Sequence, residues 1–225
     1  MHVDQLVSRY PRLYHMAEAG GWPSIRGLGL LPTAQLVEDF GPPPDVRAAI
    51  LGQPRTRSFV LTDPRLGRAV IRDQVPLRPH ILAQRLTGLT IPEWLAILND
   101  RVFFWLDPHR LDTLLNARLN RDRAHDVLTV DSAGLVATYA SQIRLSPLNS
   151  GATLFPNAAP RGPDTFRTIA GYPYDTLRRQ RGPRNAIAEL AVIGGVPDIA
   201  KHVVRAERRR GPEILEVLDA GQAPA

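Results

Sequence analysis

The order of apolar and polar positions predicts a chain of short strands and helices. Runs of β-branched and aromatic residues with alternating or continuous apolar character are typical of strands. A tight Pro/Gly loop between two such runs predicts a hairpin. The expected strands are 13–17, the hairpin pair 58–61 and 68–71, then 102–106, 127–130, 143–145, 186–192 and a last strand at 203–204.

Helical spacing and capping residues predict the helices between these strands. Thr33 is expected to cap a helix that ends at Phe40 before Gly41, and Thr90 with Glu93 forms a capping box sequence that opens a helix to about Asn99. Further helices are expected over 45–51, after Asp107-Pro108, and from 131 or 132 to about 141. Because helices and strands alternate irregularly, the pattern favours an α+β fold over a doubly wound sheet.

The length of 225 residues fits one domain, 1–225, with a real hydrophobic core. Within it, the Pro-rich segment 41–100 reads as a helical and hairpin insert. No apolar run approaches the roughly 18 residues of a membrane span. The beginning of the chain lacks the pattern of a secretion signal, and the chain has no cysteine, so disulfides and thiolate zinc sites are excluded and a cytoplasmic location is expected.

The charge balance leaves two interpretations open. The net charge is +6, and since Lys201 is the single lysine, nearly all the positive charge is arginine. Such a balance suits a polyanionic partner such as nucleic acid, or it reflects GC-rich coding. Clusters at 178–184 and 205–210 are candidate binding faces, with a solvated surface as the alternative.

Common catalytic motifs are missing from the sequence. No glycine cluster has the spacing of a P-loop or a dinucleotide fingerprint, no histidine and carboxylate pair has metal-ligand spacing, and no serine lies in a nucleophile elbow. ATPase, Rossmann, metal-dependent and standard hydrolase functions are therefore disfavoured, and no metal is expected.

Two polar residues interrupt apolar strands. Glu189 lies within 186–192, on the predicted face of Ile187 and Ala191, and a buried carboxylate is costly unless it has a partner or a function. An exposed position on an edge strand, or an ion pair with arginine, is the alternative. His15 shares a face with Leu13 and Ala17, where a structural histidine is the commoner case.

Taken in order, four blocks resemble ADP-ribosyltransferases, most closely the DarT-type toxins that modify DNA. The blocks are LYHMAEAGGWPSIRGLGLL (13–31), VFFWLDPHR (102–110), IRLSPLNSGA (143–152) and NAIAELAVIGGVPDIAKHVV (185–204). The resemblance implies small split mixed or antiparallel sheets around a cleft, with peripheral helices. One residue before Arg110 is extra relative to the family pattern, and segment 41–100 has no clear counterpart.

The resemblance also implies NAD as the substrate and a role for each matching residue. Glu189 would be catalytic, together with Arg110 on the diphosphate. The cofactor would contact His15, Tyr14, Phe104 or Trp105, Ser146 and Asn149, and single-stranded nucleic acid would contact Arg178, Arg179, Arg181 and Arg184. A toxin of this kind implies an antitoxin partner.

Two other functions remain open at this point. The first is a catalytically silent basic module of the same fold that binds nucleic acid or protein. The second is a different transferase, such as one handling an RNA 2′-phosphate, which requires several arginines converging on a pocket around His15.

Overall fold

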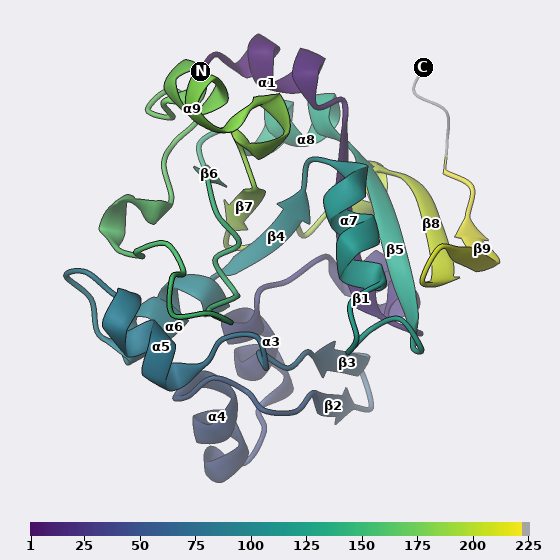
Figure 1. The fold of residues 1–225 in the computed structure, drawn as a ribbon. Coiled ribbons are helices and arrows are strands. Elements are labelled where there is room, and N and C mark those ends of the chain that lie inside the picture. The colour runs from purple at the N-terminus through teal and green to yellow at the C-terminus, as the bar shows by residue number, and fades with distance from the viewer. Residues whose placement is uncertain (222–225) are drawn as a thin grey trace.

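The computed structural model describes residues 1–221 and has an α+β architecture built on one large antiparallel sheet (Figure 1). Within these residues the sheet has seven strands in the order β6-β7-β4-β1-β5-β8-β9. Their bounds are β1 Arg12–Glu18, β4 Arg101–Trp105, β5 Ala124–Asp131, β6 Ile143–Ser146, β7 Glu189–Ile193, β8 Val203–Arg210 and β9 Glu213–Asp219. A separate hairpin consists of β2 Phe59–Asp63 and β3 Gly67–Ile71. The sheet is thus one large layer rather than the small sheets that were expected.

Short helices surround this sheet. They are α1 Val3–Arg9, α2 Trp22–Leu28, α3 Thr33–Phe40, α4 Pro44–Leu51, α5 Pro79–Arg85, α6 Ile91–Asn99, α7 Pro108–Leu115, α8 Ser132–Tyr139 and α9 Tyr174–Arg181, with single 3₁₀ turns at 163–165, 183–185 and 199–201. The capping box of α6 is confirmed: the Glu93 side chain accepts from the Thr90 backbone N–H, and Thr90 Oγ1 accepts from Glu93 N–H. In α3, however, Pro32 occupies the cap position and Thr33 is already helical.

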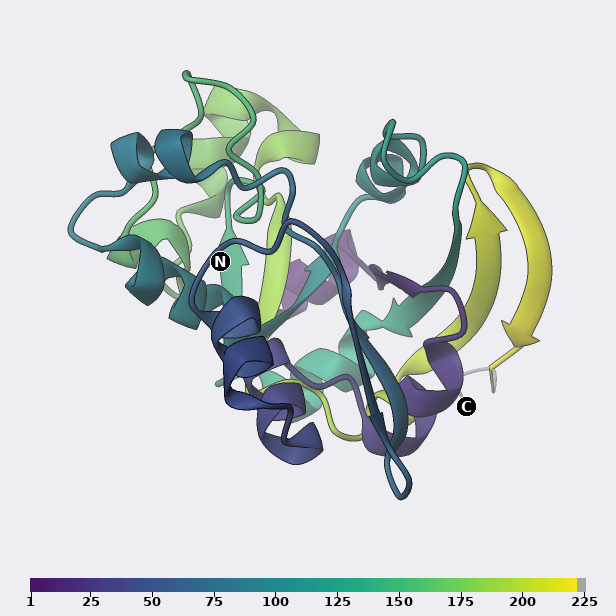
Figure 2. The same ribbon diagram turned by 90° about the horizontal axis from the view of Figure 1, so that it is seen from below.

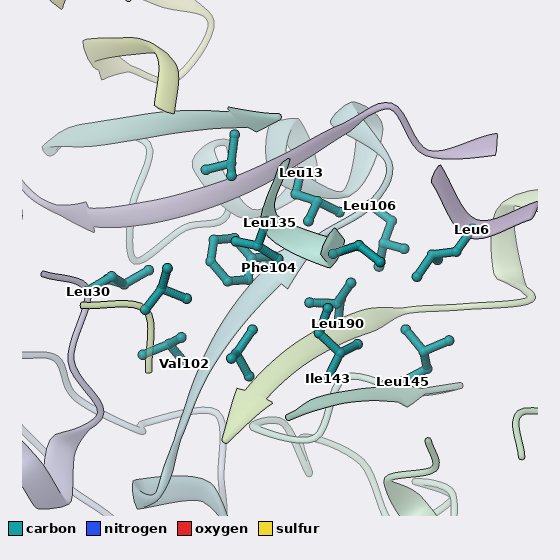
Figure 3. Packing of buried hydrophobic residues seen from close by; sticks show 14 of the residues in the cluster. Leu6, Leu13, Leu30, Val102, Phe104, Leu106, Leu135, Ile143, Leu145 and Leu190 are labelled. Atoms are coloured by element: carbon teal, nitrogen blue, oxygen red, sulfur yellow. The ribbon is translucent and has the colours of Figure 1, made fainter. Parts of the chain in front are cut away.

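The main core lies on the sheet face that α1 and α8 cover (Figure 3). Leu13, Phe104 and Leu190 project from adjacent strands into this cluster and meet Leu6 of α1 and Leu135 of α8. On the opposite face, Leu111 and Leu115 of α7 pack against residues of β1 and β5. Apolar residues therefore pack on both faces of the sheet, which fits the apolar run that follows Glu189 in β7.

The sheet divides between β1 and β4. β1 pairs with β5 along its whole length, but in the described part of the chain it pairs with β4 only at Tyr14 and Trp105. Beyond that pair the strands diverge, and the ring of His15 bridges them through Nδ1, 2.9 Å from the carbonyl oxygen of Phe103. The strands thus form a fork within a single sheet, and not the separate small sheets that were expected.

Segment 41–100 supplies a wall beside this fork. Figure 2 shows the β2–β3 hairpin between the two halves of the sheet, as seen from below. Leu61 and Ile71 of the hairpin pack with Val37 and Ile50 in a small cluster of their own. The hairpin is also tied to α2, because the Ser24 hydroxyl donates to the Arg68 carbonyl.

The C-terminal strands extend beyond the prediction. The strand expected at 203–204 continues as β8 to Arg210, and β9 follows it at the sheet edge. The basic cluster 205–210 lies on β8 beside carboxylates: Arg208 is 2.9 Å from both Asp126 and Glu216, and Arg209 is 3.4 Å from Asp112. These arginines therefore hold the sheet edge together, and they do not form a free binding face.

Candidate functional site

A cavity of about 390 Å³ occupies the fork. Its wall includes His15 of β1, Phe103 and Trp105 of β4, Glu189 of β7 and Asn149 of the loop after β6. Residues of the β2–β3 hairpin and of the segment after it complete the wall. This volume is within the range of pockets that hold small molecules and cofactors.

The strand register explains how Glu189 reaches the cavity. Glu189 lies opposite Trp105 on one side and opposite Ser146 on the other, and Trp105 in turn lies opposite Tyr14. Directly opposite residues in an antiparallel sheet project from the same face. The first residue of β7 therefore points toward the fork, while the next one, Leu190, enters the core.

Glu189 is buried, with 4% of its surface exposed. Its Oε2 accepts a hydrogen bond from the Ser150 backbone N–H at 3.0 Å, and it makes no ion pair among the described residues. Burial raises the pKa of Glu189 to about 7, and this effect outweighs the hydrogen bonding of Ser150 and the charges of Arg161 and Arg110, which lower it. The exposed and ion-paired alternatives are thus both excluded.

The loop that carries Ser150 is held by a buried arginine. Arg161 donates through Nη2 to the Asn149 carbonyl at 3.0 Å and also to the Ala152 carbonyl, one residue on either side of Ser150–Gly151. It places positive charge near Glu189 without forming an ion pair with it. Sequence reasoning missed Arg161, because nothing in a loop sequence indicates which distant arginine will brace it.

His15 is a neutral side chain at the fork. Burial lowers its pKa to about 4, which outweighs the opposing effect of the hydrogen bond to Phe103; the nearby charge of Arg72 lowers the pKa further. Since a carbonyl oxygen can only accept, Nδ1 carries the proton and Nε2 is left as an acceptor. A ligand hydroxyl or amide is a suitable donor to it.

The remaining expected site residues divide into those at the cavity and those away from it. Trp105 and Asn149 line the cavity with His15 and Glu189. Phe104 does not, because it lies on the core face with 1% of its surface exposed (Figure 3), and it therefore cannot stack on a ligand there. Ser146 is fully buried and bonds to its own turn at Leu148, and Tyr14 packs against the α7 cluster.

Arg110 lies beside the cavity rather than on its wall. It is at the start of α7, and its Nη2 donates to Asn185 Oδ1 at 2.8 Å. Its charge is still close enough to Glu189 to lower the pKa of that carboxyl. The Arg110 contact also ties α7 to the 183–185 turn that precedes β7.

The second basic cluster is a free surface. Arg178, Arg179 and Arg181 lie on α9, Arg184 follows in the 183–185 turn, and all four are exposed. None of them forms an ion pair within residues 1–221, although Arg181 donates to the Pro147 carbonyl. The cluster thus borders both the turn before Glu189 and the loop that carries Ser150.

A divided antiparallel sheet with a buried carboxyl and a neutral histidine in the fork defines an α+β protein with a ligand-sized cleft. The chain belongs to a family of unknown function, DUF7002, whose model matches residues 11–203. The matched range includes segment 41–100 and both strands that border the fork. No curated protein matches the chain.

No group of three or more His, Asp or Glu side chains in the described residues is placed to hold a metal ion. Among residues 1–221, no helix has the length and apolar character needed to cross a membrane.

Proposed function

We propose that the protein is an NAD-dependent ADP-ribosyltransferase that modifies nucleic acid in the cytoplasm, as a toxin or defence factor. The observation that carries the proposal is the buried Glu189 carboxyl, which lines the same cavity as His15 and Trp105. These three residues come from three strands far apart in sequence. They are also three of the positions that the resemblance to ADP-ribosyltransferases implies.

In this reaction the bond between nicotinamide and ribose breaks, and nicotinamide leaves with the bonding electrons. Positive charge develops on the ribose, and a fixed carboxylate stabilises such an oxocarbenium-like state. Glu189 supplies that carboxylate in its ionised form. A nucleophile on the target then bonds to the ribose carbon and loses its proton, which Glu189 can accept because its pKa lies near 7.

The other cavity residues would orient the substrate. His15 Nε2 would accept a hydrogen bond from a ribose hydroxyl, and the Trp105 ring would pack against the nicotinamide. The four exposed arginines at 178–184 would bind the phosphate backbone of the target. A single strand is the expected form, since a base that reacts must be accessible.

The test is transfer of label from NAD that carries ³²P in its adenylate phosphate. The protein is incubated with labelled NAD and, in separate reactions, single-stranded DNA, duplex DNA, RNA and a protein lysate. The proposal predicts label on single-stranded nucleic acid and none with Glu189→Gln. Absence of both label transfer and NAD hydrolysis would favour a silent binding module, recognised by salt-sensitive nucleic-acid binding that Glu189→Gln leaves unchanged.

One observation favours a second candidate, transfer of an RNA 2′-phosphate to NAD. Arg55, Arg68 and Arg72 line the cavity together with His15, as a phosphate pocket around that histidine requires. Incubation of a 2′-phosphorylated oligonucleotide with NAD distinguishes the two reactions. Loss of the 2′-phosphate without modification of a base would select this second candidate.

A further inference from the structure

The wall of the cavity that segment 41–100 supplies is rich in arginine. Arg55, Arg68 and Arg72 all line the cavity, and Asp73 is the acidic residue beside them. The three arginines lie before β2, on β3 and directly after β3. The hairpin therefore presents net positive charge to the cavity.

Arg55 holds this wall in place through its Nε and Nη1 atoms. Its Nε donates to the Arg72 carbonyl at 2.8 Å, and its Nη1 donates to the Ile50 carbonyl and to Asn99 Oδ1, both at 3.0 Å. Because these acceptors belong to α4, α6 and the chain after β3, Arg55 fixes the position of the Arg72 backbone. Arg55 is thus a positioning residue for Arg72.

Arg72 has capacity left for a ligand. Its Nη2 donates to Asn120 Oδ1 at 3.1 Å, but its buried Nε makes no hydrogen bond within the described residues. The carboxylate nearest to it, that of Glu18, is 4.0 Å from this Nε and is bound more closely by Arg123, at 2.6 Å. A guanidinium that is largely buried and only partly neutralised is an unfavourable arrangement unless an anion completes it.

We propose that Arg72 binds a phosphate group of the ligand that occupies the cavity. Guanidinium groups bind phosphate through charge-assisted hydrogen bonds, and a protein anchor such as Asn120 fixes the geometry before the ligand arrives. Arg72 lies close enough to His15 to affect its titration, so the phosphate would bind beside the group that faces the sugar. Identifying the phosphate as the diphosphate of a dinucleotide rests on the proposed function.

Binding of ADP, 2′-AMP and adenosine to the wild-type protein, measured by calorimetry in phosphate-free buffer, tests the site without turnover. At least one phosphorylated ligand is expected to bind about ten-fold more tightly than adenosine. A preference for ADP assigns the diphosphate of a dinucleotide, whereas a preference for 2′-AMP assigns a phosphate on a polynucleotide. Equal affinity for all three, or no binding, overturns the proposal.

Two arginine variants test whether the preference for phosphorylated ligands depends on Arg72. Arg72→Met is expected to remove the preference for phosphate while affinity for adenosine is retained. The matched control is Arg65→Met in the turn of the same hairpin, where the side chain is 88% exposed, and this variant should bind like the wild type. An Arg72→Met protein that keeps the full preference contradicts the proposal.

A measurement on the wild-type protein avoids any effect of a variant on folding. Phenylglyoxal modifies accessible arginines, and the Arg72 side chain is 27% exposed. Peptide mass spectrometry should find Arg72 protected by the phosphorylated ligand and unprotected by adenosine; equal labelling overturns the site. A protein that binds ADP through Arg72 but does not consume NAD would disprove the proposed function alone.

Discussion

At the scale of single residues, the proposed reaction depends on the Glu189 carboxyl, which is kept partly protonated near neutral pH. The folded protein holds the Glu189 proton up to a pKa of about 7, above the ordinary pKa of 4.5 for a glutamate side chain. The native state therefore binds more protons than the unfolded state between these values, and stability falls as the pH rises through that window. The ionised Glu189 carboxylate in the cavity thus lowers the free energy of unfolding of the protein at high pH.

The first prediction is that Glu189→Gln stabilises the protein at high pH. A neutral amide can still accept from Ser150 N–H but never ionises, so the stability lost by the wild type should be retained. Above pH 8 the free energy of unfolding of the variant should exceed that of the wild type by about 3 kcal/mol, and this difference should vanish near pH 4.5. Urea unfolding of both proteins across pH 4.5–8.5 measures it, and a gain that is independent of pH would contradict the assigned pKa.

The second prediction concerns the pH dependence of the reaction itself. If the ionised carboxylate stabilises the transition state, kcat/KM for NAD should rise through an apparent pKa near 7 and then level off. His15 should add no further change in kcat/KM between pH 5 and 9, because its pKa lies near 4 and it stays neutral across this range. A profile that is flat across pH 6–8 is incompatible with this role for Glu189.

At the scale of elements, two glycines of the first block differ in what they do. Gly29 ends α2 with φ at 96°, and a Cβ there would lie 2.5 Å from Pro197 Cα. It allows Leu30 to pair with Val196, which joins the start of the chain to the turn after β7. Gly27 lies within α2, where a Cβ would have nothing within 4 Å.

The third prediction compares these two glycines. Gly29→Ala should destabilise the fold by roughly 2–4 kcal/mol, because the backbone conformation and the close approach of Pro197 both disfavour a side chain. Gly27→Ala should stabilise it by about 0.5–1 kcal/mol, since alanine favours a helix. Thermal unfolding measures both, and equal melting temperatures would show that α2 is not anchored at Gly29.

Periodicity and capping signals predict elements well where the information is local. The Thr90 capping box and the 58–71 hairpin were both foreseen, because each depends on residues close in sequence. The strand at Glu189 was expected from Ala186, but the regular strand begins at Glu189, and residues 186–188 link it to the 3₁₀ turn at 183–185. β9 was missed, because its pairing partner, β8, lies in a charged segment that does not have the pattern of a strand.

The site was less predictable than the elements. Alternation placed Phe104 and Trp105 on opposite faces but could not say which face borders a cavity. Arg72 and Arg161 carry no local signal, because their roles arise from segments brought together only in the folded chain. Burial of Glu189 likewise depends on β6 pairing outside β7, and strand order cannot be read from strand sequences.

At the scale of the whole molecule, positive charge serves two purposes. Arg205, Arg208 and Arg209 of β8 are matched by carboxylates, whereas the arginines at 178–184 are exposed and without ion pairs in the part of the chain described. The net charge of +6 therefore does not show where a polyanion can bind. The exposed arginines at 178–184 are available to it, whereas the ion-paired arginines of β8 are not. The free cluster lies next to the turn that leads into Glu189.

The fourth prediction separates this local cluster from net charge. Replacing Arg178, Arg179 and Arg181 by Gln should weaken binding of single-stranded DNA and reduce the slope of log K against log salt by about 2. The same number of charges removed at Arg57, Arg65 and Arg118, which are exposed elsewhere, is the control. Fluorescence anisotropy at several salt concentrations measures both, and equal losses would mean that binding follows net charge alone.

The catalytic role of Glu189 is tested by the release of nicotinamide from NAD by the wild type and by Glu189→Gln, measured at pH 8 with single-stranded nucleic acid present. The wild type should release nicotinamide, and the variant should do so more slowly by about a hundred-fold or more, although it is at least as stable at that pH. Release that is equal in the two proteins, or undetectable in both, would contradict this role of Glu189.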